Sequence, residues 1–249
     1  MKLRLLSLLA AAVSLGAVHS VSAADLPVKA PAYKAPPRVV GDMWSGGYYG
    51  GHIGGGWTDN EFFDPRGVLA PVGTSRNSNT AGILGGAQVG FNWQFRTLLL
   101  GIQGDFSLTD LESKVAAPLL ASATIGNDTN WVTTLTGRAG FTWDRALIYA
   151  KGGGAWVRNK YFVIDPAVGI NSRATAIRTG WVAGAGVEYS FAPDWSAFVE
   201  YDYIGLGSSN IPMFDPARGV TPLGVKQDIQ MVKVGLNYRL LPWPPRPWW

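Results

Sequence analysis

Few residues carry ionisable side chains, and eight of them lie in segments where polar and apolar residues alternate. Their place in the alternation puts all eight on the polar face of these segments. They are Asp105, Arg138, Lys151, Glu188, Glu200, Asp202, Lys233 and Arg239. Four acids and four bases on one face could form a gated ion path or a proton relay, or they could neutralise one another as salt bridges. We expect mutual neutralisation, because the segments are predicted below to enclose an interior that side chains fill.

His52 is the remaining candidate for acid–base or metal chemistry. A histidine beside a serine and an acid could act as a hydrolase triad, but no serine stands next to His52 in a pattern that would put the two on an outward strand end. His52 is the only histidine left once the expected signal peptide is removed, and one histidine without cysteine is a poor metal site. The glycine runs GGHIGGG, GILGGAQVG and KGGGAW lack the Lys-Ser/Thr ending of a phosphate loop and open no helix. We therefore expect no catalytic residue, no cofactor and no metal.

The segments that position these residues follow a two-residue period from Trp44 onward. This period is typical of β-strands with one apolar and one polar face. We count eight such segments: Gly47 to Trp57, Ala81 to Phe95, Leu98 to Leu108, Trp131 to Trp143, Ala146 to Trp156, Thr179 to Phe191, Trp195 to Tyr203, and Ile229 to Leu240. Each approaches the nine to eleven residues that a tilted strand needs to cross a bilayer.

The connections between the segments alternate in length. Three are two or three residues long, at Arg96, Asp144 and Ala192. The other four run to roughly twenty residues. These long connections are Thr58 to Thr80, Thr109 to Asn130, Arg158 to Arg178, and Gly205 to Asp228. This alternation of short and long connections is typical of an outer-membrane barrel with short periplasmic turns and long extracellular loops. An even strand number puts both chain ends on the periplasmic side.

The aromatic residues indicate which face contacts lipid, since alternation alone would also suit a soluble sandwich. One group falls beside the short turns or the end of the last strand: Trp93, Phe95, Phe141, Trp143, Tyr189, Phe191, Trp195 and Tyr238. A second group falls at the opposite strand ends: Trp57, Trp131, Trp156 and Trp181. Aromatic side chains gather at both interfaces of a membrane, whereas a soluble core would hold them mid-strand. We therefore expect the apolar face to contact lipid and the polar face to line the interior.

Backbone hydrogen bonding then requires the strands to close. An unpaired N–H or C=O in hydrocarbon costs several kcal/mol, so the strands must form a cylinder without edges. Eight strands leave an interior just wide enough for side chains to fill. The sequence therefore predicts an all-β, eight-stranded antiparallel transmembrane up-and-down β-barrel whose interior charges neutralise one another. A narrow channel for ions or small solutes is the alternative.

The N-terminus indicates export. Lys2 and Arg4 precede an apolar run that is too short to cross a bilayer, and small residues follow it. We expect a signal peptide over residues 1–23, cleaved between Ala23 and Ala24, then a Pro-rich periplasmic linker over 24–43, the barrel over 44–240 and a Pro/Trp-rich tail over 241–249. Without the leader, 19 Lys and Arg face 17 Asp and Glu, and they form no cluster of the kind that binds nucleic acid. No cysteine is present, which excludes disulfides and a lipoprotein anchor.

The chain also resembles a known family. The motifs are ADLPVKAP, WSGGYYGGHIGGGW, GGAQVGFNWQF with LLLGIQGDFS, GRAGFTWDRALIYAKGGGAW, GAGVEYSFAPDWSAFVEYDY and VKVGLNYRL. In this order they resemble the small outer-membrane immunogenic proteins of Rhizobiales, which are related to the OmpA-type transmembrane domain. The resemblance implies a surface-exposed, antigenic barrel of the Gram-negative outer membrane, often called porin-like, with no catalytic residues.

The resemblance also implies partners. These are outer-membrane lipids, lipopolysaccharide and the barrel-assembly machinery, with no nucleic acid. Two residues depart from the family pattern, because Gly47 stands where an aromatic is usual and Leu240 where a terminal Phe ends the last strand. Either Leu240 suffices for assembly or the aromatic end at Trp249 substitutes. We expect the tail to be disordered or to lie at the periplasmic interface.

Overall fold

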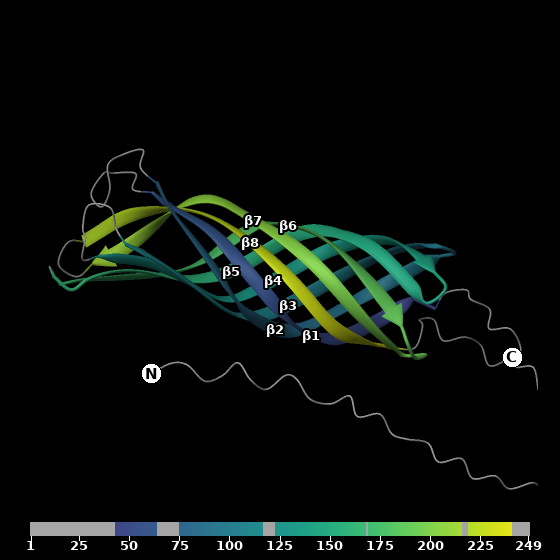
Figure 1. Cartoon of the computed structure of the whole chain (residues 1–249). Helices are drawn as coiled ribbons and strands as arrows, with labels where there is room; N and C mark the ends of the chain where they lie inside the picture. Colours follow the sequence, from purple (N-terminus) through teal and green to yellow (C-terminus); the bar gives the residue numbers. More distant parts are fainter. Residues whose placement is uncertain (1–42, 64–74, 117–122, 168, 216–218, 241–249) are drawn as a thin grey trace, which may run out of the picture. The chain divides into compact units, whose positions relative to one another are not determined.

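Eight antiparallel strands form a closed barrel in the computed structural model (Figure 1). The structure describes residues 43–63, 75–116, 123–167, 169–215 and 219–240. The strands are β1 (Gly46–Phe63), β2 (Ser75–Phe95), β3 (Leu98–Ala116), β4 (Thr124–Trp143), β5 (Ala146–Asp165), β6 (Ile170–Ser190), β7 (Trp195–Asp215) and β8 (Gly219–Arg239). The expected signal peptide, its cleavage site, nearly all of the linker and the tail lie outside the described residues.

Each strand pairs with its neighbours in sequence, and β1 pairs with β8 to close the ring. The closing register sets Tyr48 opposite Arg239 and His52 opposite Gly235. Leu240 continues this seam, because its backbone N–H donates to the Gly47 carbonyl at 2.8 Å. No edge is therefore left between β1 and β8, as hydrocarbon surroundings require.

The short turns lie where the sequence places them. β2 and β3 are joined through Arg96 and Thr97, β4 and β5 through Asp144 and Arg145. Arg96 and Asp144 adopt left-handed backbone conformations, with φ of 58° and 51°. Such φ values suit two-residue hairpin turns, whose twist matches that of the flanking strands.

The outer ends of the strands differ from the sequence prediction. The strands are 18 to 21 residues long, so much of each expected long loop is strand. For example, β5 continues to Asp165 although a loop was expected from Arg158. The prediction ended each strand where the bilayer ends, but the alternation continues beyond it.

β-bulges mark the level at which the strands leave the expected bilayer. The β3–β4 register shifts between Leu108 and Leu111, and the β7–β8 register shifts between Gly205 and Ser208. Gly207 in the second bulge has φ of 63°, a conformation that glycine adopts without strain. A bulge changes which face each following residue points to, so the inward pattern on β7 resumes with Ile211.

The interior consists of layers, which β8 shows most simply. Its buried, inward residues run from Lys233 through Met231 and Ile229 to Gln227 and then Val225. Charged, apolar, polar and apolar levels thus follow one another toward the extracellular end. Three apolar layers result. The periplasmic layer comprises Trp44, Leu99, Leu147 and Tyr149; the middle layer comprises Leu84, Leu111, Val132, Ala155, Val157, Val182, Ile204, Leu206, Ile229 and Met231; the outer layer comprises Phe62, Ala123, Ile125, Tyr161, Val163, Ile211, Met213 and Val225.

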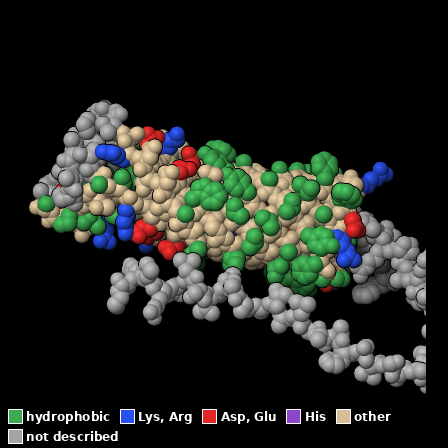
Figure 2. All heavy atoms as spheres, viewed as in Figure 1, with side chains coloured by type: hydrophobic (Ala, Val, Ile, Leu, Met, Phe, Trp, Pro, Cys, Tyr) green, Lys and Arg blue, Asp and Glu red, His purple; other side chains and the backbone are tan. Residues whose placement is uncertain are grey.

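The outer surface is apolar over the half of the barrel that contains the short turns. Large apolar side chains such as Ile83, Leu135 and Val199 are exposed there. Figure 2 shows hydrophobic side chains around this part of the barrel, and most of the charged side chains in view lie toward the opposite end. None of the described residues form a helix long and apolar enough to cross a membrane.

Candidate functional site

Arg138 and Glu188 form the first part of a charged network inside the barrel. Arg138 on β4 donates from Nη2 to Glu188 Oε2 on β6 at 3.0 Å, and both side chains are buried. The guanidinium lies over the Tyr149 ring, 4.2 Å from its centroid, and also contacts the Tyr48 ring. The Asn237 amide donates to the other Glu188 oxygen at 2.9 Å. The ion pair is thus enclosed by aromatic rings and hydrogen-bond donors.

Lys151 and Lys233 form the second part, together with three carboxylates. Lys233 Nζ lies 2.7 Å from Glu200 Oε1, 2.7 Å from Asp202 Oδ2 and 3.2 Å from Asp105 Oδ1. Lys151 Nζ contacts the same three carboxylates at 2.7, 3.1 and 3.5 Å. Both ammonium groups are fully buried. Each therefore has three acidic neighbours in place of water.

Neutral side chains join the two parts. Tyr149 donates its hydroxyl to Glu200 Oε2 at 2.8 Å. Gln103 accepts from Arg138 Nη1 at 2.8 Å and donates through Nε2 to Asp105 at 3.2 Å. Seven of the eight charged residues expected inside the barrel therefore form one connected set.

Arg239 is the exception: it is buried on the inward face as expected, but its contacts are separate from those of the other seven residues. Its guanidinium lies at the periplasmic end, where it donates to Ser190 Oγ at 2.6 Å and to the Pro193 carbonyl at 2.8 Å. It also lies over the Trp44 ring, 4.8 Å from the centroid. Arg239 forms no ion pair within the described part of the chain. It fixes the β6–β7 turn and Trp44 against the end of the barrel, because the short turn presents carbonyl oxygens there.

Buried apolar side chains lie on both sides of the network, as a small cluster on one side and a layer across the barrel on the other. Toward the periplasm lie Trp44, Leu99 and Leu147, each at most 2% exposed. Toward the extracellular end lies the middle layer, where Ile204 and Ile229 are fully buried. Buried charges are tolerated when they are paired and hydrogen-bonded. The surroundings of the network thus meet the condition for a self-neutralised set.

His52 has neighbours that the sequence pattern did not indicate. Its Nε2 lies 2.8 Å from Ser107 Oγ on β3, and its Nδ1 lies 3.2 Å from Gln88 Oε1 on β2. Gly86 permits this approach, because a Cβ there would lie 2.9 Å from His52 Nε2. Ser107 is 55 residues away in sequence, so only the strand register could have identified it. Gln88, and not a carboxylate, orients the ring.

Beyond the middle layer, a polar layer spans the barrel. Thr129 donates to Asn159 Oδ1 at 2.7 Å, and Asn159 donates to Gln227 Oε1 at 2.8 Å. Next to this layer, burial raises the pKa of the Tyr161 hydroxyl above its ordinary value, and the positive charge of Arg178 partly opposes the rise. Arg178 itself donates to the carbonyls of Leu206 and Gly207 at the β7 bulge. The layer holds strands together and contains no ion pair among the described residues.

The aromatic residues expected at the two membrane interfaces lie on the outward face. In the periplasmic group Trp143 is 84% exposed, and Trp195 packs edge-on against Tyr238 with centroids 5.2 Å apart. Two further rings belong to this group, since Tyr49 contacts Tyr238 and Phe91 contacts Trp93. The remaining periplasmic members, Phe95, Phe141, Tyr189 and Phe191, are also exposed.

The outer group of aromatics is broader than the sequence indicated. Trp181 contacts Tyr203, with ring centroids 5.3 Å apart, and Trp57 contacts Tyr201 at 6.5 Å. Trp131 packs against Phe106, and Trp156 is outward and exposed. Tyrosine and tryptophan suit an interface because one end of each ring system is polar.

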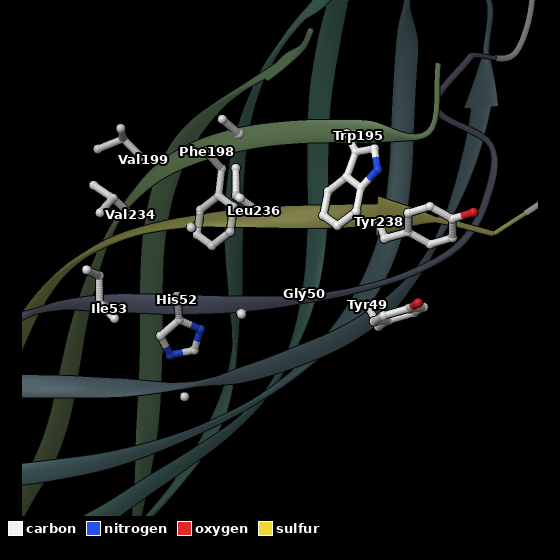
Figure 3. Close-up of a pocket in the computed structure, with 14 residues that line it drawn as sticks. Tyr49, Gly50, His52, Ile53, Trp195, Phe198, Val199, Val234, Leu236 and Tyr238 are labelled. Atoms are coloured by element: carbon white, nitrogen blue, oxygen red, sulfur yellow. The ribbon is translucent and has the colours of Figure 1, made fainter. Parts of the chain in front are cut away.

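A shallow apolar groove lies on the outward face of β1, β7 and β8 (Figure 3). Its volume is about 870 Å³. The rings of Tyr49, Trp195 and Tyr238 stand at one end, and Ile53 and Val199 stand at the other. Its floor is low at Gly51, an outward position that contributes no side chain. The groove lies within the apolar surface and includes rings of the periplasmic aromatic group.

The described residues contain no group of three or more His, Cys, Asp or Glu side chains arranged to hold a metal ion. The three carboxylates around Lys151 and Lys233 are occupied by the two ammonium groups. The site is therefore an ion-paired interior whose chemistry is charge neutralisation.

A closed ring of eight strands with an apolar exterior, two aromatic belts and a charged, enclosed interior defines a transmembrane β-barrel of the outer-membrane class. The comparisons agree with this class. Residues 8–239 match the family described as outer membrane protein beta-barrel domain, and the chain belongs to that family.

Two relatives within the outer-membrane proteins are similar to this chain over most of its length. The chain is similar to the 31 kDa outer-membrane immunogenic protein of Brucella melitensis biotype 1, with 29% identity over 94% of this chain and 99% of that protein. It is also similar to the 25 kDa outer-membrane immunogenic protein of Brucella abortus biovar 1, with 26% identity over 87% of this chain and 89% of that protein. The expected resemblance is thereby confirmed.

Two solved structures share the fold. The outer membrane protease OmpT from Escherichia coli matches with a TM-score of 0.51 at 10% identity, over 78% of this chain and 96% of that chain. The outer membrane protein OprG from Pseudomonas aeruginosa matches with a TM-score of 0.50 at 14% identity, over 79% and 98%. At such identities the likeness concerns the fold alone. The protein is an outer-membrane β-barrel of a Gram-negative bacterium.

Proposed function

We propose that the protein is a non-enzymatic structural barrel with a closed interior and an antigenic extracellular end. One observation carries the proposal: the middle apolar layer, with residues from β2 to β8, lies across the barrel on the extracellular side of the charged network. A conducting pore needs a continuous polar path, and an ion in an apolar layer loses its hydration without gaining partners. The names of the immunogenic relatives support the antigenic end.

The network supports the same proposal through its geometry. Lys151 and Lys233 each contact three carboxylates, so neither ammonium is left to bind a passing anion. Eight-stranded barrels have interiors that side chains can fill. A set of this kind specifies the strand register, because a one-residue slip of a strand would turn the charges of that strand toward lipid.

The surroundings of His52 support a non-enzymatic role. His52 is 4% exposed, and its ring contacts Ser107 and Gln88 inside the barrel wall. A hydrolase triad needs a carboxylate at the second ring nitrogen and an open approach to the serine. Lipid A mass spectrometry with and without the protein tests this part, and an altered lipid would overturn it.

Planar-bilayer recording tests the closed interior. We expect no steady single-channel conductance from the purified full chain. Replacing Ile204 and Met231 together by Gly removes part of the middle layer, and this variant is expected to conduct or flicker. Steady conductance of the unmodified protein, abolished by Glu200→Ala or Lys233→Ala, would instead establish the alternative, a narrow channel for ions or small solutes.

The export and assembly steps complete the proposal. We propose cleavage between Ala23 and Ala24, a periplasmic linker, and insertion by the barrel-assembly machinery. The intact mass of the membrane-extracted protein tests the cleavage, which predicts a chain that begins at Ala24. Deletion of residues 241–249 tests the tail, since unchanged assembly would assign the end of the assembly signal to Leu240.

A further inference from the structure

The outward face of the barrel carries charge very unevenly beyond the outer aromatic belt. On β5 and β6 the outward charged residues are Arg158, Lys160 and Arg173, which we call the basic patch. On β1, β3 and β8 the outward charged residues are instead mostly acidic: Asp59, Glu61, Asp110, Glu112, Lys114, Lys226 and Asp228. One side of the barrel therefore presents positive charge and another side presents net negative charge at the same level.

The strand register gathers the basic patch. Arg158 and Lys160 are two residues apart on β5, so their side chains point the same way. Arg173 on β6 is opposite Phe162, which follows Lys160 by two residues on that face. The three basic side chains thus follow one another along a single two-stranded ribbon.

The cations of the basic patch are not neutralised by the protein. All three side chains are exposed, and none forms an ion pair within the residues that the structure describes. Asp128 is opposite Lys160 in the β4–β5 register, but the contact it makes is a hydrogen bond from Asn130 at 3.1 Å. On the acidic side, by contrast, Lys114 pairs with Glu112 at 2.7 Å.

The basic patch begins where the apolar surface ends. Trp156 precedes Arg158 by two residues on the same face of β5. Ile177, which is 61% exposed, is the register partner of Arg158, and Trp131 is its partner on β4. Cationic groups therefore stand directly above aromatic and aliphatic side chains, at the level where lipid headgroups meet acyl chains.

We propose that the basic patch binds the anionic headgroup of a lipopolysaccharide molecule in the outer leaflet, with its acyl chains against Trp156, Ile177 and Trp181. Guanidinium and ammonium groups are the side chains that recognise phosphate. The acidic side would repel the same headgroup, so binding is confined to β5 and β6. This inference rests on the outer-membrane location and does not depend on whether the interior conducts.

A second copy of the chain is the competing occupant, since its acidic side would also complement the patch. The observations favour the lipid. The patch is continuous with the lipid-facing surface through Trp156 and Ile177, and three cations within two strands suit a compact headgroup. Much of the acidic side is already engaged, because Lys114 pairs with Glu112 and Gln230 donates to Asp59 at 3.4 Å.

The test measures binding of bis-phosphorylated lipid A to the full chain in detergent. The variant carries R158Q, K160Q and R173Q, and the matched control carries K114Q and K226Q on the acidic side. Each basic residue near an anionic lipid surface strengthens binding, so we expect the triple variant to bind about a hundredfold more weakly. The control variant is expected to bind within about twofold of the unmodified protein.

Further arms identify the source of the anion. Enzymatically dephosphorylated lipid A is expected to bind the unmodified protein as weakly as the triple variant binds intact lipid A, and tripolyphosphate is expected to compete only at much higher concentration. Equal binding of intact and dephosphorylated lipid A would overturn the proposal. So would unchanged lipid binding by the triple variant, or a dimer of the unmodified protein that the triple variant alone fails to form, which would identify a second copy as the partner.

Discussion

The two halves of β5 have opposite polarity. Between the aromatic belts its outward side chain Ile148 is 64% exposed, while Lys151 is buried inside. Beyond the belts, Arg158 is outward, and Val163 is buried among apolar neighbours. Both halves of β5 pair antiparallel with β4 and β6, with one register shift on the β4 side between Thr129 and Trp131. The surrounding solvent, hydrocarbon for one half and water for the other, therefore determines which face of the strand is apolar.

The interior of each half follows from its exterior. In the membrane half, the outward face takes the apolar side chains, so the interior is held by ion pairs and hydrogen bonds. In the extracellular half, apolar side chains such as Phe62 and Met213 fill the inside, as in a soluble protein. The middle apolar layer separates the two arrangements.

Removal of a central cation should have the largest effect on the membrane half. In Lys233→Ala, Asp105, Glu200 and Asp202 keep a single ammonium partner, Lys151, so uncompensated charge stays buried. We expect a loss of about 3–5 kcal/mol in the free energy of unfolding, because breaking one side of a buried ion pair is strongly destabilising. Urea unfolding in detergent, followed by heat-modifiable gel mobility, measures it.

The control for this prediction is Lys226→Ala, on the same strand but exposed. We expect it to change the free energy of unfolding by no more than about 0.5 kcal/mol. Equal effects of the two substitutions would show that the interior network contributes nothing beyond ordinary surface charge.

A cation introduced at two levels of one outward face compares the surroundings of the two halves. Val199→Arg places a cation on β7 between the belts, and Asn210→Arg places one on the same strand beyond them. We expect the first to cost about 2–4 kcal/mol in lipid and the second close to zero. Unfolding in lipid vesicles gives both values, and similar costs at the two positions would mean that both face the same solvent.

The smallest expected effect concerns packing. Ile125→Val leaves a small cavity in the outer apolar layer and should cost about 1 kcal/mol. Ile102→Val lies on the lipid-facing surface, where acyl chains fill the space, so it should be nearly neutral. Hydrogen exchange of the extracellular strand ends is the readout, and increased exchange in both variants would contradict the distinction.

The membrane half could be predicted from sequence, because three signals agree there. Period-two alternation, short turns at Arg96 and Asp144, and aromatic side chains at the strand ends all follow from contact with a bilayer. The extracellular half was missed because the phase of the alternation reverses at the belt: Trp156 is apolar and outward, whereas Val157 is apolar and inward. A strand prediction that requires the apolar residues to stay on one face therefore stops where they change to the other face.

The sequence could predict which charged residues face the interior, but not which of them contact one another. Strand parity puts Arg138 and Arg239 on the same inward face, yet only Arg138 reaches the network. Which inward residues meet depends on the register of non-adjacent strands and on how side chains extend across the barrel. The contact of His52 with Ser107 arises in the same way.

The chain contains no cysteine, so a single introduced cysteine can carry a spin label at any chosen position. The most direct test of the central claim compares labels at Leu135 and Val199, between the belts, with labels at Thr175 and Asn210, beyond them. In bilayers, we expect the first two to collide mainly with dissolved oxygen and the last two mainly with a water-soluble nickel complex. Equal access of the nickel complex to all four positions would contradict the account.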